Sequence, residues 1–270
     1  MKLERLTFLV GLLLASAAMC SAANETYYFY VFSNPVAGHE DEYNKWYNEQ
    51  HAPDVVSIPG FRTAQRFVKD DLPLYRMVDL QVPKYLVIYK IVTDNVNAVF
   101  DEVSRRLKTG ETIMSPAFDQ KTSVSYVYRP FRPEIKGVGG EPEGAKPGPK
   151  QTYYQVVFTA MVEGKEREFN LFYDQHHAPE LAAIPGFVSA QRMVLARPST
   201  GSIPATKYLA LFKVETSDLA AVKQAATKPG TSSPAFDTKA TRGYTFRAIG
   251  PVIQGDQVRS ARAKRVPRTK

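Results

Sequence analysis

Two histidines, His51 and His177, are the side chains of this sequence best suited to proton transfer. Each is expected to end an amphipathic helix on its apolar side, one turn after Tyr47 or Tyr173. An imidazole titrates at about pH 6.5 when unperturbed, so at the mouth of an apolar pocket it could exchange a proton with a phenol, an enol or a carbonyl compound. A structural role stays open, because a histidine at a helix C-terminus also hydrogen-bonds the last carbonyls and interacts favourably with the helix dipole.

Several other side chains are candidates for contact with a small ligand. Tyrosine rings suit a core, but a tyrosine hydroxyl can orient a polar ligand atom, and a glutamine can supply an amide inside a pocket. The phenylalanine of a repeated Ser-Pro-Ala-Phe-Asp segment either closes the pocket as a lid or belongs to a turn that places the following strand. The candidate ligand-binding residues are Trp46, Tyr47, Gln65, Tyr85, Phe118, Tyr173, Gln191, Tyr208 and Phe236.

Acidic residues that follow the repeated His-Ala-Pro motif are expected to form structural ion pairs with strand arginines. The adjacent His176 and His177 do not indicate a metal site, because neighbouring side chains on a helix point about 100° apart. No nucleophile elbow, P-loop or dinucleotide glycine pattern is present, so we expect neither a metal nor a cofactor. The expected ion pairs are Asp54 with Arg66 and Glu180 with Arg192.

The region around each histidine occurs twice in the chain. Residues 26–66 return at 152–192, an offset of 126 residues, with roughly half of the positions identical and no gap. Two later blocks, Lys-Tyr-Leu and Ser-Pro-Ala-Phe-Asp, also occur in both copies in the same order. This period is longer than the 20–50 residues or so of a solenoid repeat, and it has the length of a small domain. The sequence therefore predicts a duplicated domain.

The hydrophobic periodicity predicts the order β-α-β-β-α-β in each copy, which is the ferredoxin-like arrangement. The first helix is expected to span residues 40–51 with its aromatic side chains on one face, and Pro53 is expected to stop it. Because the first and third strands are apolar on both sides, the helix-free face of each sheet must be covered, and the other copy is the obvious cover. The other expected elements are strands at 27–33, 61–69, 85–92 and 121–128 with a helix at 95–107, and strands at 153–159, 187–195, 207–214 and 241–248.

The pattern Tyr43-x-x-Trp46-x-x-x-x-His51-Ala-Pro, followed by Ile-Pro-Gly-Phe and Arg66, resembles the EthD-like branch of the dimeric α/β-barrel superfamily. The resemblance covers both copies. It implies an α+β fold in which tandem ferredoxin-like domains form one intramolecular two-sheet α/β barrel with a pocket in each copy. Members of the superfamily include cofactor-free monooxygenases, lyases, decarboxylases, cyclases and haem-using enzymes. Copy two has Phe172 where copy one has Trp46, so we expect the two pockets to differ.

Three segments lie outside the two copies. Residues 1–23 have a charged start, an apolar run and small residues before a cleavage point, which predicts a signal peptide and a periplasmic or secreted protein. A lipid anchor at Cys20 is the alternative, although Met19 is a poor fit before a lipidated cysteine. The remaining divisions are a domain at 24–131, a Pro- and Gly-rich linker at 132–150, a second domain at 151–250 and a basic disordered tail at 251–270.

The net charge of +8 lies mostly at the ends of the chain, since residues 1–23 carry +1 and the residues from Asp256 onward carry +5. The folded part is nearly neutral, which argues against a nucleic-acid partner. Contact of the tail with anionic surfaces and a higher homo-oligomer stay open.

The residues favour an exported cofactor-free enzyme of lyase, isomerase or monooxygenase type. It would act on a small hydrophobic, aromatic compound with a pocket histidine as the acid–base group. The first alternative is a binding protein that uses the same pocket without turnover. The second is a haem-binding protein in which His51 or His177 ligates the iron.

Overall fold

The structure is a computed structural model that describes residues 23–72, 74, 82–200, 205–227 and 230–265. The predicted signal peptide, with Cys20, lies outside the described residues except for its last position, and so does the end of the predicted tail. Of the helices in the described ranges, none is both long enough and apolar enough to cross a membrane.

Each half of the chain has the predicted order β-α-β-β-α-β. Copy one contains β1 (Glu25–Pro35), α1 (Glu40–Trp46), the π-helical turn η1 (Tyr47–His51), α2 (Ala52–Val56), β2 (Phe61–Lys69), β3 (Tyr85–Thr93), α3 (Val96–Thr109) and β4 (Phe118–Pro130). Copy two contains β6 (Gln151–Thr159), α4 (Glu166–Phe172), the π-helical turn η2 (Tyr173–His177), α5 (Ala178–Ala182), β7 (Phe187–Thr200), β8 (Tyr208–Thr216), α6 (Leu219–Ala226) and β9 (Arg242–Gln254). The short β5 (Ile135–Lys136) and the C-terminal α7 (Gly255–Arg265) lie outside this order.

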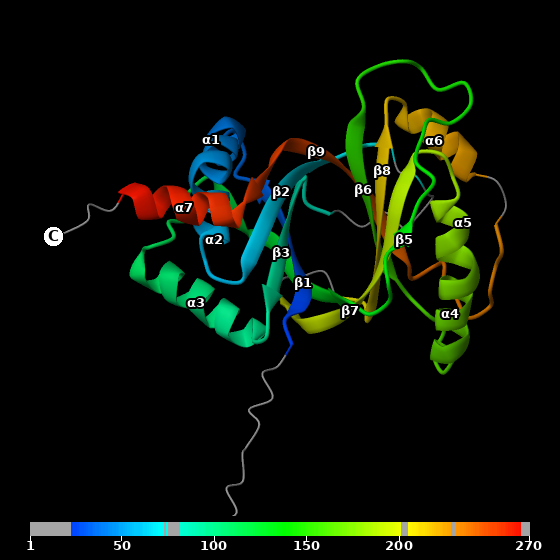
Figure 1. Cartoon of the computed structure of the whole chain (residues 1–270), viewed down its shortest axis with the longest axis horizontal. Helices are drawn as coiled ribbons and strands as arrows, with labels where there is room; N and C mark the ends of the chain where they lie inside the picture. The colour runs from blue at the N-terminus through cyan, green and yellow to red at the C-terminus, as the bar shows by residue number, and fades with distance from the viewer. Residues whose placement is uncertain (1–22, 73, 75–81, 201–204, 228–229, 266–270) are drawn as a thin grey trace, which may run out of the picture.

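The two sheets join at both edges into a closed barrel. In the described residues the strand order is β4-β1-β3-β2-β9-β6-β8-β7, and β4 pairs with β7 to complete the circle. One seam is β2 with β9 and the other is β4 with β7, so each copy supplies one strand to each seam. Figure 1 shows α1, α2, α3 and α7 on one side of the barrel and α4, α5 and α6 on the opposite side.

The barrel interior is a core built from the helix-free faces of both sheets. Its largest fully buried side chains are aromatic, and they come from both copies: Tyr30, Phe32, Phe67, Tyr126, Tyr128 and Phe246. Two further cores lie outside the barrel, each between one sheet and the helices of the same copy. The face that each copy would expose alone is therefore buried against the other copy, which confirms the predicted α+β barrel within one chain.

The first helix of each copy does not stop at its histidine, and this part of the prediction is wrong. α1, η1 and α2 form one helical run, in which the backbone N–H of Ala52 donates to the carbonyl of Tyr47 five residues earlier. A proline inside a regular α-helix lacks an N–H and collides with the preceding turn. The wider π turn changes the backbone hydrogen bonds just before Pro53 from a four-residue to a five-residue spacing, and the helix continues to Val56. Copy two repeats this geometry, so both histidines lie within a helical run and neither caps its C-terminus.

The repeated Ile-Pro-Gly-Phe motif makes the turn between this helix and the next strand. Gly60 and Gly186 have φ values of 96° and 97°, in the left-handed region that favours glycine. A Cβ atom at these positions would lie 2.8 Å from Val99 and 2.6 Å from Val222, so the turn also packs closely against the second helix of each copy.

The predicted disordered tail is wrong for residues 251–265, which complete β9 and form α7. The Arg259 side chain donates hydrogen bonds to the carbonyls of Val56 (2.8 Å) and Phe61 (3.1 Å). Arg262 donates to the Ser57 hydroxyl (2.9 Å) and forms an ion pair with Asp54. Arg259 therefore satisfies the last carbonyl of α2, where cations are favoured, and Arg262 binds side chains of the same helix end.

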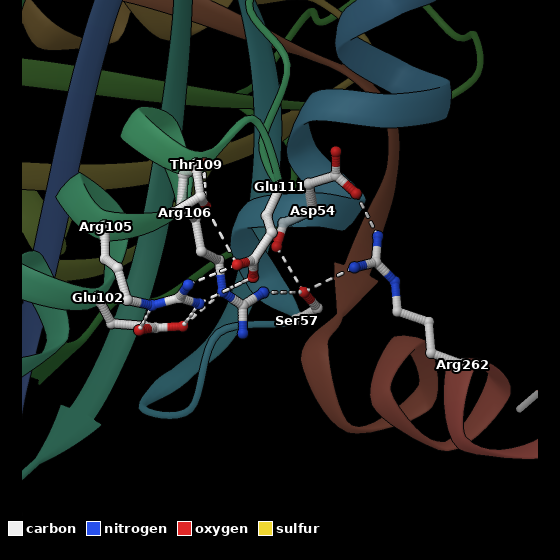
Figure 2. A network of polar contacts seen from close by, with 8 residues as sticks. All are labelled: Asp54, Ser57, Glu102, Arg105, Arg106, Thr109, Glu111 and Arg262. Atoms are coloured by element: carbon white, nitrogen blue, oxygen red, sulfur yellow. Dashed lines mark hydrogen bonds and ion pairs between the residues drawn. The ribbon is translucent and has the colours of Figure 1, made fainter.

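Figure 2 shows how this contact continues into the second helix of copy one. Arg106 in α3 donates to the same Ser57 hydroxyl (3.0 Å) and to Glu102 (2.7 Å), and Arg105 binds both Glu102 and Glu111. The network therefore connects α2, α3 and α7.

The predicted linker covers the corresponding place on copy two. It contains β5, which pairs with β7, and otherwise forms neither helix nor strand between residues 132 and 150. The backbone N–H groups of Val138 and Gly139 donate to the carbonyls of Ala182 (3.0 Å) and Phe187 (2.7 Å). These carbonyls occupy the same positions in copy two as those bound by Arg259 in copy one.

Candidate functional site

An apolar cavity of about 170 Å³ lies between the helices and the sheet of copy one. Its walls come from β1, η1, α2, β3, α3, β4 and the segment that leads into β4. Most of the lining is hydrocarbon, including Phe29, Val55, Tyr89, Val103 and Met114. A cavity of this kind suits a small hydrophobic molecule, and its few polar groups would orient that molecule.

His51 reaches this cavity from the last residue of the π turn. Its ring stacks on Trp46, with centroids 4.4 Å apart, and meets the edge of Tyr47 at 5.0 Å. Its Nδ1 is buried and has no hydrogen-bond partner among the described residues. Burial lowers the pKa of His51 to about 4, so the imidazole is neutral at pH 7.

Thr112 supplies a second polar atom to the same cavity. Its Oγ1 is also buried without a partner in the described structure, and the side chain lines the cavity together with His51. Buried polar atoms nearly always have a hydrogen-bond partner, and leaving one unpaired costs about 1–3 kcal/mol. Because both of these residues line one apolar cavity, it is suited to a ligand that carries a hydroxyl or carbonyl group.

The predicted ligand-binding residues of copy one separate into three groups. Phe118 lines the cavity with His51, while Trp46 and Tyr47 contact the histidine ring from outside. The Trp46 indole N–H donates to the carbonyl of Ile113 (3.0 Å), which fixes the segment beside the cavity. Tyr85 lies in a different, polar pocket, and Gln65 lines neither of these two cavities.

In copy two the histidine is enclosed by rings. His177 contacts Phe172 at 5.5 Å, Tyr173 at 4.8 Å and Phe236 at 5.5 Å. Burial lowers the pKa of His177 to about 4 as well. The predicted ligand residue Gln191 instead donates to the backbone carbonyl of Arg132 (2.7 Å) and so holds the start of the linker.

The Tyr208 hydroxyl, also predicted to contact a ligand, donates to Glu166 (2.5 Å) and accepts from Asn170 (3.3 Å). It belongs to a polar network that has a counterpart around Tyr85 in copy one.

The predicted ion pairs are wrong in both copies. Asp54 pairs with Arg262 of α7, and Glu180 accepts hydrogen bonds from Thr231. Each strand arginine instead binds side chains one and two turns before the histidine, because the guanidinium extends under the N-terminal part of the helical run. Arg66 binds Asn44 and Asn48, and Arg192 binds Asn170 and Asp174. The repeated four-residue spacing of these helix partners was the sequence signal for this contact.

Thr112 and Met114 are cavity residues that sequence reasoning missed. They precede the repeated Ser-Pro-Ala-Phe-Asp segment, where copy one and copy two differ and no periodic pattern is present. Within the described residues, no group of three or more His, Cys, Asp or Glu side chains is placed to hold a metal ion.

The fold and this site define a single-chain α/β barrel with a buried histidine between helices and sheet in each half. No family model and no curated protein matches the chain. Among solved structures, an anthrone oxidase-like protein has 11% identity and a TM-score of 0.47, covering 86% of this chain and 93% of its own. A proposed monooxygenase of Fusobacterium nucleatum subsp. nucleatum has 8% identity and a TM-score of 0.47, covering 86% and 95%. A proposed monooxygenase of Lactobacillus acidophilus has 11% identity and a TM-score of 0.46, covering 85% and 100%.

These similarities are too low to carry an activity from those proteins to this chain. One fold also hosts many unrelated functions. The function must therefore be argued from the chain's own residues.

Proposed function

We propose that copy one is a cofactor-independent enzyme of lyase, isomerase or monooxygenase type for a small hydrophobic, aromatic compound, with His51 as its acid–base group. The observation that carries this proposal is an apolar cavity lined by His51 and Thr112, each of which has a buried polar atom without a partner among the described residues. The His-Ala-Pro and Ile-Pro-Gly-Phe motifs in both copies support an EthD-like tandem arrangement as the origin of this site.

The chemistry follows from the neutral imidazole. A substrate with an acidic O–H or C–H directed at the imidazole donates its proton to the unprotonated ring nitrogen, and the same nitrogen returns the proton to another atom of the substrate. The resulting imidazolium and substrate anion attract each other, and this attraction offsets part of the cost of charging a buried ring. Thr112 can donate its hydroxyl proton to the oxygen on which negative charge develops.

The cavity volume limits the ligand. Sites for drug-sized molecules have volumes of about 300–1,000 Å³, so about 170 Å³ admits one or two fused rings at most. A compound of that size is what we propose for copy one, in place of the haem of the second alternative.

Binding without turnover is the second candidate, and the low pKa of His51 favours it. A base with a pKa of about 4 is weak at neutral pH, since general bases work best with a pKa close to the operating pH. Accepting a hydrogen bond from a bound hydroxyl requires no protonation of the ring.

One experiment separates the two candidates without the natural substrate. 1-Tetralone is a small aromatic ketone with an exchangeable α-hydrogen, and its binding can be followed through the emission of Trp46, the single tryptophan. The enzyme proposal expects α-deuterium exchange in D₂O, and His51→Asn should slow it about 10²–10⁴-fold. The matched variant His177→Asn in copy two should leave exchange intact. Binding without accelerated exchange would favour the binding protein, and absence of both would reject the cavity as the site.

We also propose that the chain is exported and that its mature form begins after residue 23. The charged and apolar start of the sequence supports this. The mass of the protein purified from the extracellular or periplasmic fraction tests it, since cleavage after Ala23 and a lipid on Cys20 give different masses.

A further inference from the structure

A second pocket, of about 390 Å³, lies on the outer face of the barrel where β2 of copy one meets β9 of copy two. It shares no lining residue with the cavity of His51. Its charged lining residues are Arg66, Lys84, Arg247 and one carboxylate, Glu40. Lys84 forms an ion pair with Glu40 (2.6 Å), so the remaining cations of the lining are Arg66 and Arg247.

Arg66 is a buried cation with no carboxylate partner among the described residues. Its side chain is held by amide oxygens, with Nη1 donating to Asn48 Oδ1 (2.6 Å) and Nη2 to Asn44 Oδ1 (2.8 Å). Arg66 is only 3% exposed, and its Nε is buried with no hydrogen-bond partner in the described ranges. A buried charge without a counter-ion is costly, so this guanidinium is suited to binding an anion.

Copy two shows the same arrangement with the charge neutralised. Arg192 binds Asn170 as Arg66 binds Asn44, but Asp174 replaces Asn48 and forms an ion pair with Arg192 (2.5 Å). The carboxylate of Asp174 therefore identifies the kind of group that this guanidinium takes as its partner.

Two further differences close the corresponding space in copy two. The Phe131 ring lies 4.8 Å from the Arg192 guanidinium and 5.1 Å from the Tyr208 ring, and Arg132 forms an ion pair with Asp174 (2.7 Å). In copy one the chain has Ile249 and Gly250 at these positions, and both line the open pocket.

We propose that the Arg66 pocket of copy one binds a small molecule through a carboxylate group. A planar carboxylate matches the guanidinium, and the ligand would supply, beside Asn48, the negative charge that Asp174 supplies in copy two. Asn48 and Arg247 line the same pocket and can donate further hydrogen bonds to the ligand. This inference stands independently of the proposed reaction at His51.

The test uses benzoate as the carboxylate probe, benzamide as its neutral isostere, and titration calorimetry on the full chain. Benzoate should bind, and benzamide and inorganic phosphate should bind at least tenfold more weakly. Asn48→Asp places a carboxylate beside Arg66, as in copy two. It should lower the affinity for benzoate at least tenfold, while the melting temperature is maintained or raised.

Asn97→Asp in α3 is the matched control, because it adds the same charge at an exposed position outside the pocket. It should leave benzoate affinity unchanged, and His51→Asn should do the same. Equal affinity for benzoate in Asn48→Asp and in the unchanged protein would overturn the proposal, as would phosphate binding more tightly than benzoate. Loss of benzoate binding in His51→Asn alone would place the probe in the apolar cavity and overturn it too.

Discussion

The ion pair between Arg192 and Asp174 gives the sharpest test of how the two copies differ. Replacing Asp174 by Asn makes copy two resemble copy one at this position, where Asn48 accepts from Arg66. The Arg192 side chain is 4% exposed and that of Asp174 is 24% exposed, so solvent screens the pair only partly. We expect Asp174→Asn to fold and to lose stability.

The size of the loss follows from what the substitution keeps. Removing one partner of a buried ion pair usually costs about 3–5 kcal/mol, because the other charge is left unpaired. An asparagine keeps one acceptor oxygen, so the change is from a charge-assisted bond of about 1.5–3 kcal/mol to a neutral one of about 0.5–1.5 kcal/mol. The free energy of unfolding should therefore fall by about 1–2 kcal/mol. At about 2–4 °C per kcal/mol for a chain of this size, the melting temperature should fall by several degrees.

Urea denaturation of the full chain measures this difference directly. Arg132→Gln is the matched control, since it removes the exposed partner of the same carboxylate and should cost about 0–1 kcal/mol. A loss below about 0.5 kcal/mol for Asp174→Asn would refute the reasoning, because changes of that size are typical of ordinary surface substitutions.

Three more predictions follow from the fold. Residues 24–131 alone should dimerise or aggregate in sedimentation experiments, since they expose the aromatic barrel face; a stable monomer would contradict the shared core. Truncation after Gln254 should lower the unfolding free energy by about 2–4 kcal/mol, because the carbonyls of Val56 and Phe61 lose the hydrogen bonds of Arg259; unchanged urea denaturation would reject this role for α7. Both buried histidines have a pKa of about 4, below the usual 6.5, so between these values the unfolded chain binds more protons than the folded chain. The free energy of unfolding should therefore fall as the pH is lowered from 6.5 to 4. The free energy of unfolding, measured by urea denaturation, should depend less on pH in the His51→Asn, His177→Asn double variant. An unchanged pH dependence would contradict the buried neutral rings.

The outcome at particular residues shows where sequence reasoning succeeded. The paired position of His51 and His177 was readable because the same local pattern surrounds each one. Their place inside a helix was not, since Pro53 normally ends a helix and only the π turn carries the chain past it. The segment with Thr112 and Met114 has no hydrophobic periodicity, so the sequence did not predict that it lines the cavity.

The sequence by itself determined the duplication, the order of strands and helices, and which faces are apolar. These properties are local, because strand and helix periodicities depend on neighbouring residues. Only the tertiary structure decided that Arg262 pairs with Asp54, that Arg192 meets Asp174, and that Arg66 meets no carboxylate in the part of the chain that the structure describes. Partner choice among charged side chains depends on how elements far apart in the chain lie against one another. A hydrophobic pattern shows which face of an element is buried, but it does not specify the polar group that it will meet there.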